Sequence, residues 1–166
     1  MDVFCEYIVK KQRNGKDIAI IIGAYFLAFV LTILFLGIGV KYFNGLGLLI
    51  ICAFWYGAVQ IMKGRYIEYE YALTNNELDV DKIVAKKRRK HILTVDFNNI
   101  ELCSKANSEN MDLNREVKLY DFTGESENDI YFVDYTNESG RIRVLFQPTD
   151  KMKESIRLIN PRNVRI

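Results

Sequence analysis

Residues 18–40 have the sequence IAIIIGAYFLAFVLTILFLGIGV, and none of these side chains is charged. A helix of about 23 residues rises about 34 Å, which is enough to cross a hydrocarbon core of about 30 Å. A second apolar stretch, residues 46–62, is about 17 residues long, the lower limit for a spanning helix. Only Lys41–Gly45 separates the two, and Asn44-Gly45 favours a turn. We therefore expect a transmembrane helical hairpin over residues 18–62, because a small soluble domain could not enclose two helices that are apolar on every face.

Small side chains occur in both expected spans, where they allow two helix backbones to approach closely. Folding the chain about Phe43 places Ala28 near Ala58. The residues that we expect to pack within the hairpin are Ala24, Ala28, Ala53, Gly57 and Ala58. Because small residues are common in any apolar span, we interpret this pattern as packing and not as a functional site.

The distribution of basic residues predicts the orientation of the hairpin. Lys and Arg are enriched in the cytoplasmic segments that flank membrane spans. Four basic residues precede the first span and two follow the second, whereas Lys41 alone lies in the connecting loop. We therefore expect a two-span protein of the cell membrane with both termini in the cytoplasm. The spans contain no charged residue, so nothing indicates an ion path or a proton relay.

Residues 1–17 form an N-terminal cytoplasmic or interfacial segment in this scheme. Val3, Phe4, Tyr7 and Ile8 have helical spacing, and basic residues follow them. This pattern predicts a short helix that lies in the membrane interface, with a disordered tail as the alternative.

Residues 66–166 are expected to form a soluble α+β domain. Alternating apolar and polar residues indicate half-buried strands, beginning with Ile67, Tyr69, Tyr71 and Leu73. The expected strands cover residues 66–73, 77–81, 91–97, 100–104, 117–122, 130–136 and 141–146, with a loop over 105–115. A helix follows them, because Pro148-Thr149-Asp150 supplies start signals, Met152, Ile156 and Ile159 form an apolar stripe, and Asn160-Pro161 stops it.

Seven antiparallel strands followed by one helix resemble the pleckstrin-homology (PH) fold, in which a C-terminal helix closes a bent barrel. The segment YEYALTNNELDVDKI, residues 69–83, is similar to the opening of bacterial PH-like membrane proteins. DVFCE at residues 2–6 and GKD at residues 15–17 resemble an uncharacterised two-pass family of Gram-positive bacteria. This resemblance covers nearly the whole chain. It implies a PH-like cytoplasmic domain and a membrane location, and it brings no activity or functional residues.

Five consecutive basic residues lie between the second and third expected strands: Lys86, Lys87, Arg88, Arg89 and Lys90. A solvated loop is the simplest interpretation of this run. The functional alternative is contact with anionic lipid headgroups, to which each Lys or Arg near the surface contributes about 1 kcal/mol. A domain that begins a few residues after a membrane span is held close to such headgroups.

Other functional classes find little support. The net charge is only +2 and the basic run lacks interleaved aromatic residues, so we expect no nucleic acid partner. His91 is the only histidine, and no nucleophile, phosphate-binding or metalloprotease motif occurs. Cys5, Cys52 and Cys103 have no metal-binding spacing. We therefore expect neither an enzyme nor a bound cofactor.

The sequence favours a membrane-anchored, non-catalytic PH-like module for binding or scaffolding at the cytoplasmic face. Its partners would be the lipid bilayer and either another protein or a second copy of the chain. One alternative is a sensor of anionic lipids that uses residues 86–90. A further alternative is an unrecognised enzyme or the accessory subunit of a transporter.

Overall fold

The computed structural model describes residues 4–39, 46–106, 117–138 and 140–166. These residues form two compact units, one of Arg13–Tyr66 and one of Met1–Gln12 together with Ile67–Ile166. The first unit is helical, whereas the second contains two sheets and a helix, which confirms a mixed α+β protein. The turn predicted at Lys41–Gly45 and all but the first two residues of the loop predicted at 105–115 lie outside the described residues.

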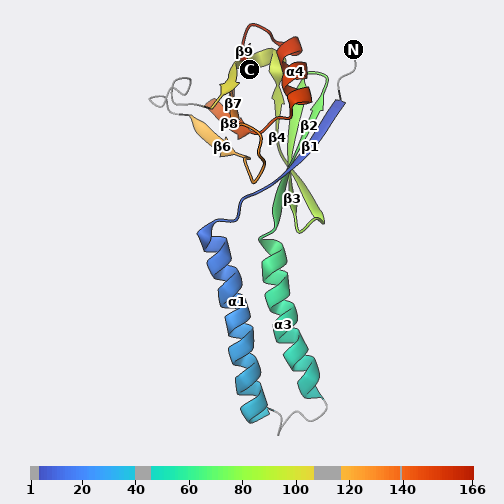
Figure 1. The fold of residues 1–166 in the computed structure, drawn as a ribbon, viewed down its shortest axis with the longest axis vertical. Coiled ribbons are helices and arrows are strands. Elements are labelled where there is room, and N and C mark those ends of the chain that lie inside the picture. The colour runs from blue at the N-terminus through green and yellow to red at the C-terminus, as the bar shows by residue number, and fades with distance from the viewer. Residues whose placement is uncertain (1–3, 40–45, 107–116, 139) are drawn as a thin grey trace. The chain divides into compact units, whose positions relative to one another are not determined.

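Two apolar helices make up the first unit. They are α1 (Gly15–Leu34), which continues as the π-helical turn η1 (Phe35–Gly39), and α3 (Gly47–Gly64). The two helices lie side by side (Figure 1). Their apolar stretches, of 23 and 18 residues, are long enough to cross a membrane, and only 11% of each is buried. A core helix of a soluble protein is mostly buried, and these two helices are not.

Aromatic and small side chains form the contact between α1 and α3. The rings of Tyr25 and Trp55 lie 6.2 Å apart, and those of Phe35 and Phe54 lie 6.4 Å apart in an edge-to-face arrangement. Ala28 is buried in the helical unit. Such contacts supply the dispersion and the close approach that hold packed helices together.

The first sheet contains four antiparallel strands in the order β1-β2-β3-β4. These are β1 (Phe4–Lys10), β2 (Ile67–Thr74), β3 (Glu77–Val84) and β4 (Arg88–Asp96). One face of the sheet is apolar, and its strands contribute Cys5, Val9, Tyr69, Tyr71, Leu73, Leu78, Val80 and Val95 to the core. The predicted alternation in residues 66–81 therefore matches the observed faces of β2 and β3.

The interfacial helix predicted near the N-terminus is wrong for the described residues, because residues 4–10 form the strand β1. This strand pairs with β2 over its whole length, with Cys5 opposite Leu73 and Val9 opposite Tyr69. Apolar residues in a segment this short fit a helical and a strand period almost equally well. The unpaired edge of β2 decides between them, because pairing satisfies the backbone groups of both strands and buries Val9 completely.

The second sheet contains five strands in the order β6-β8-β7-β5-β9. They are β5 (Ile100–Lys105), β6 (Lys118–Asp121), β7 (Tyr131–Asn137), β8 (Gly140–Phe146) and β9 (Val164–Arg165). The pairs β6·β8 and β5·β9 are parallel. The prediction of seven antiparallel strands therefore needs correction, since the described residues form nine strands and two of the pairs are parallel.

Helix α4 (Asp150–Ile159) completes the core of the second unit. The hydroxyl of Thr149 caps its first turn by accepting a hydrogen bond from the backbone N–H of Met152. Met152 and Ile156 are completely buried among residues of both sheets. The apolar stripe predicted for this helix thus finds its partner in the space between the sheets.

The loop between β6 and β7 forms a backbone hydrogen bond with β1. The backbone N–H of Glu125 donates to the carbonyl of Lys10 over 2.8 Å. A side chain at Gly124 would place its Cβ 2.0 Å from that carbonyl oxygen, so only glycine fits there. The buried amide of Gln147 holds the loop in shape by accepting from Gly124 N–H and donating to the carbonyls of Ser126 and Asn128.

Candidate functional site

Strand register places the turn between β3 and β4 at a particular end of the first sheet. Ile67, the first residue of β2, pairs with Val84, and Val84 pairs with Arg88. At the same end, Lys10 is opposite Glu68, and the backbone N–H of Lys11 donates to the carbonyl of Ile67 over 3.0 Å. The basic run therefore lies at the same end of the sheet as the last residue of β1, which leads to α1, and the first residue of β2, which follows α3.

The basic run is only partly a loop. Ala85 and Lys86 adopt positive φ angles of 54° and 55°, and the backbone N–H of Lys87 donates to the carbonyl of Val84. This is the geometry of a tight hairpin turn. Arg88, Arg89 and Lys90 already belong to β4, so the solvated loop predicted over residues 86–90 is wrong for its last three residues. Hairpin pairing fixes their side chains alternately on the two faces of the sheet.

Arg89 and His91 project from one face of β4 toward carboxylates of neighbouring strands. Nη2 of Arg89 lies 2.5 Å from Oε2 of Glu70, whose side chain is only 7% exposed, and Nε lies 3.9 Å from Oδ2 of Asp81. Nδ1 of His91 lies 2.9 Å from Oδ1 of Asp81. A buried carboxylate without a compensating charge would be costly, so Arg89, whose own side chain is 60% exposed, forms an ion pair with a buried group.

The opposite face of the same strands carries three cations without such partners. Lys82 pairs in register with Lys90. Arg88 lies two residues before Lys90 and therefore on the same face. Among residues 4–39, 46–106, 117–138 and 140–166, none of the three forms an ion pair. We call Lys82 of β3 together with Arg88 and Lys90 of β4 the free basic face.

His91 also takes part in a chain of side-chain contacts that has the residue types of a hydrolase triad. Its Nε2 lies 3.3 Å from the hydroxyl of Thr94. That hydroxyl donates to Oδ1 of Asp79 over 2.5 Å, so its proton goes to a carboxylate and not to the imidazole. A catalytic triad needs the opposite arrangement, in which the imidazole accepts the proton of the nucleophile. The network therefore stabilises an exposed sheet surface.

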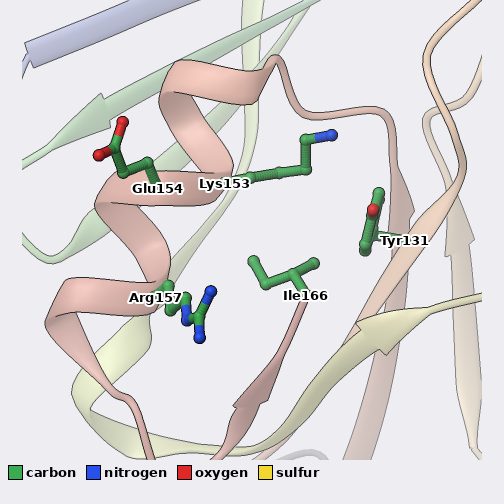
Figure 2. A pocket seen from close by; sticks show the side chains of 5 residues that line it. All are labelled: Tyr131, Lys153, Glu154, Arg157 and Ile166. Carbon is green, nitrogen blue, oxygen red and sulfur yellow. The ribbon is translucent and has the colours of Figure 1, made fainter.

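A cleft of about 390 Å³ lies beside α4 and is lined by Tyr131, Lys153, Glu154, Arg157 and Ile166. Lys153 and Arg157 point toward the side occupied by Tyr131 and Ile166, whereas Glu154 points away (Figure 2). Nζ of Lys153 lies 2.6 Å from Oδ1 of Asp150, and this hydrogen bond raises the pKa of Lys153. Charges of both signs line the cleft. The sequence pattern does not indicate it, because its residues come from β7, α4 and the C-terminal residue Ile166.

The described thiols and carboxylates do not assemble into a reactive centre. Burial, together with the negative charge of Asp134, raises the pKa of Cys103 to about 12, so this thiol is protonated at neutral pH. Within the described ranges, no group of three or more His, Cys, Asp or Glu side chains could hold a metal ion.

The residues predicted to pack within the helical hairpin differ in burial. Ala28 and Ala58 are buried, and Ala24 is half-buried. Ala53 and Gly57 are exposed, and a Cβ added at Gly57 would meet no atom within 4 Å. Their role in packing within the hairpin remains a prediction.

Comparison with known protein families yields one match. A family model described as "Bacterial PH-like domain (DUF6106)" matches residues 1–166. No curated protein and no solved structure matches the chain. The match extends over the helical unit and the sheet-containing unit alike, and it confirms the resemblance to bacterial PH-like proteins.

Proposed function

This chain belongs to the family of bacterial PH-like domains (DUF6106), and from that premise we propose that it is a membrane-anchored, non-catalytic binding module. It engages a protein partner, or a second copy of itself, at the cytoplasmic face of the cell membrane. PH-like folds present a rigid surface on which binding sites are placed, and function resides in those sites and not in the fold.

The pairing of β1 with β2 carries this proposal. The chain enters the helical pair after Lys10, the last residue of β1, and leaves it before Ile67, the first residue of β2. These two strands are hydrogen-bonded neighbours. The sheet-containing unit is therefore joined to the proposed anchor by two chain connections, which suits a module that works at the bilayer surface.

The cytoplasmic orientation rests on the basic residues that flank the helices. Lys10, Lys11, Arg13 and Lys16 precede the first apolar stretch, and Lys63 and Arg65 end the second. Positively charged flanks are retained on the cytoplasmic side during insertion. The sheet-containing unit, which includes both termini, then lies in the cytoplasm.

Site-specific photo-crosslinking in intact cells tests the proposal. A photoreactive amino acid is placed at exposed positions on three elements: Lys90 on β4, Leu119 on β6 and Leu158 on α4. We expect a crosslinked protein partner or a crosslinked dimer from at least one position. The matched control is Phe97, which is completely buried and should give none. The absence of crosslinks from all three exposed positions would contradict the proposal.

A second candidate function, the sensing of anionic lipids, is favoured by the place of the basic hairpin. Lys86 and Lys87 occupy the turn at the end of the sheet where the chain continues into both helices. Cations near an anionic leaflet contribute about 1 kcal/mol each and are screened over about 8 Å at physiological salt. Arg89 is bound to Glu70, so we assign this attraction to the remaining basic residues of the run, whether or not they have other contacts.

Reconstitution of the full chain tests the lipid candidate. Hydrogen exchange of the β3–β4 turn is measured in nanodiscs of neutral lipid and in nanodiscs with anionic lipid. We expect slower exchange in the anionic nanodiscs, and we expect the difference to disappear in Lys86→Glu/Lys87→Glu. Equal exchange in both lipids would refute lipid sensing by this hairpin.

A further inference from the structure

We infer that the free edge of β4, residues 88–94, binds an extended acidic segment of a protein partner, which adds to the sheet as a further strand. This inference rests on the proposed function, because it names the chemistry of the partner and the place where it docks. The addition of a strand to an exposed edge is a common way for a folded domain to capture a peptide.

The backbone of β4 is available on the side away from β3. Within the described part of the chain, β4 has β3 as its sole neighbour, and no backbone hydrogen bond joins residues 88–94 to any other element. The other edge strand of this sheet differs, since the carbonyl of Lys10 in β1 already accepts from Glu125. An edge of seven residues matches the usual length of a strand.

The far end of the edge is closed by a capping network. The carboxylate of Asp96 accepts hydrogen bonds from the backbone N–H of Asn98 and from the side chain of Asn76. These bonds turn the chain into the 3₁₀ turn η3 (Phe97–Asn99) and away from the sheet. An incoming strand would therefore lie between the β3–β4 turn and Thr94.

The charge of the edge selects the partner. Lys and Arg side chains on an edge strand discourage pairing between two identical edges, because like charges would lie opposite one another. The same charges attract a segment that carries Asp or Glu. A symmetric dimer through this edge would bring a second basic β4 against the first, so we assign the site to a different, acidic sequence.

The free basic face also predicts a pattern within that sequence. Lys82, Arg88 and Lys90 share one face without ion-pair partners, whereas Arg89 and His91 on the other face are bound to carboxylates of β2 and β3. Directly opposed side chains of paired strands lie about 4.5–5.5 Å apart. Acidic residues at alternate positions of the incoming strand would therefore meet this face. Half-buried Leu93 follows on the same face and favours an apolar residue beyond them.

Peptide binding to the full chain in neutral nanodiscs tests the inference. The probe is a labelled peptide with Glu at alternate positions, separated by Thr. One control peptide has the same composition with its Glu residues grouped, and the other has N-methyl groups on the amides that would face β4. We expect the alternating peptide to bind about tenfold more tightly than either control, and to slow hydrogen exchange at Arg88–Thr94.

Variants of the chain complete the test. Arg88→Glu/Lys90→Glu should weaken binding of the alternating peptide by at least about tenfold. The matched control, Lys151→Glu/Arg162→Glu, changes the net charge equally at exposed positions outside the sheet and should bind like the parent chain. Unchanged exchange outside β4 will show that the charge reversal leaves the fold intact.

Three outcomes would overturn the inference. Equal binding of the N-methylated peptide would mean that charge alone attracts the peptide. Protection of Arg88–Thr94 by anionic lipid, with no effect of any peptide, would make the occupant a lipid surface. Crosslinks of a partner from Leu119 or Leu158 but not from Lys90 would remove this site while leaving the proposed function standing, whereas the absence of all crosslinks would remove the proposed function itself.

Discussion

Glu70 explains why the five basic residues of the run are not equivalent. It lies on the inner strand β2, and its side chain is 7% exposed. Desolvation disfavours a charged carboxylate unless a cation compensates it. Arg89 supplies that cation, while its neighbours Arg88 and Lys90 point to the other face. A residue that looks like part of a binding patch in the sequence is thus a structural partner in the folded unit.

Replacement of Arg89 should therefore cost stability, unlike replacement of its neighbour. Arg89→Met leaves the Glu70 carboxylate without its partner and should lower the free energy of unfolding by about 1–3 kcal/mol. Lys90→Met, the matched control, should change it by less than about 0.5 kcal/mol. The alkylation rate of buried Cys103 reports opening of the unit and should rise about tenfold for each 1.4 kcal/mol lost. Equal rates in the two variants would contradict the structural role of Arg89.

Cys103 should also give the sheet-containing unit a dependence on alkaline pH. Burial raises its pKa from 9.0 to about 12, so the folded chain keeps a proton that the unfolded chain releases. Stability should therefore be constant below pH 9 and fall as the pH rises toward 12, with a limiting slope of about 1.4 kcal/mol per pH unit.

Urea unfolding of the full chain and of Cys103→Ala, followed by circular dichroism between pH 8 and pH 11, measures this contribution. Buried tyrosines with raised pKa values, such as Tyr71, are present in both proteins. Their contributions to the pH dependence of stability therefore cancel when the two proteins are compared. The variant should lose less stability than the parent chain over this range. Parallel curves would show that the thiol of Cys103 titrates normally in the folded state.

At the scale of elements, β1 is the strand that completes the first sheet. It brings Val9, which is 1% exposed, into the core and places Ile8, which is 50% exposed, on the outer face. It is held on one side by the ladder with β2 and on the other by the loop that contains Gly124. The N-terminal residues are therefore part of the sheet-containing unit, although α1 and α3 separate them from β2 in the sequence.

A pair of substitutions in β1 distinguishes the observed strand from the interfacial helix that the sequence pattern predicted. Val9→Asp buries a charge in the core and should destabilise the unit by several kcal/mol, raising the alkylation rate of Cys103. Ile8→Asp places the same charge on the exposed face and should have little effect. An interfacial helix with Phe4, Tyr7 and Ile8 on its apolar face predicts the reverse order. A larger effect at Ile8 than at Val9 would therefore refute the strand.

For the whole molecule, the helical pair and the two-strand connection predict a defined topology. Both termini belong to the sheet-containing unit, so the proposed two-span anchor would place this whole unit on one side of the bilayer. In the orientation proposed from the basic flanks, that side is the cytoplasm. Extraction with alkaline carbonate should leave the protein in the membrane fraction, as expected for spanning helices.

Cysteine labelling in intact cells checks the orientation. In a Cys52→Ala background, Lys41→Cys should react with a membrane-impermeant maleimide added outside the cell. Lys151→Cys, an exposed position on α4, should react only after the cells are opened. Labelling of Lys41→Cys exclusively from the cytosolic side would reverse the proposed topology.

Some features of this protein follow from local sequence alone. Long uncharged runs specify apolar helices because nothing but lipid, or a much larger protein, could cover all of their faces. Alternation from Ile67 to Leu73 specifies a strand because successive side chains point to opposite faces. Capping by Thr149 and the stripe of Met152 and Ile156 specify α4. Each of these signals is contained within a few turns or one strand.

Other features depend on residues that are distant in the sequence, and only the tertiary structure decides them. Residues 4–10 form a strand because β2, nearly sixty residues later, offers an edge. The parallel pairing of β6 with β8 and the addition of β9 to β5 likewise depend on where the chain returns. The basic run is divided between an ion pair with buried Glu70 and a free face because Glu70 lies one strand beyond β3. Pairing energy comes from contacts between strands, so a short segment cannot specify its partner by its own composition.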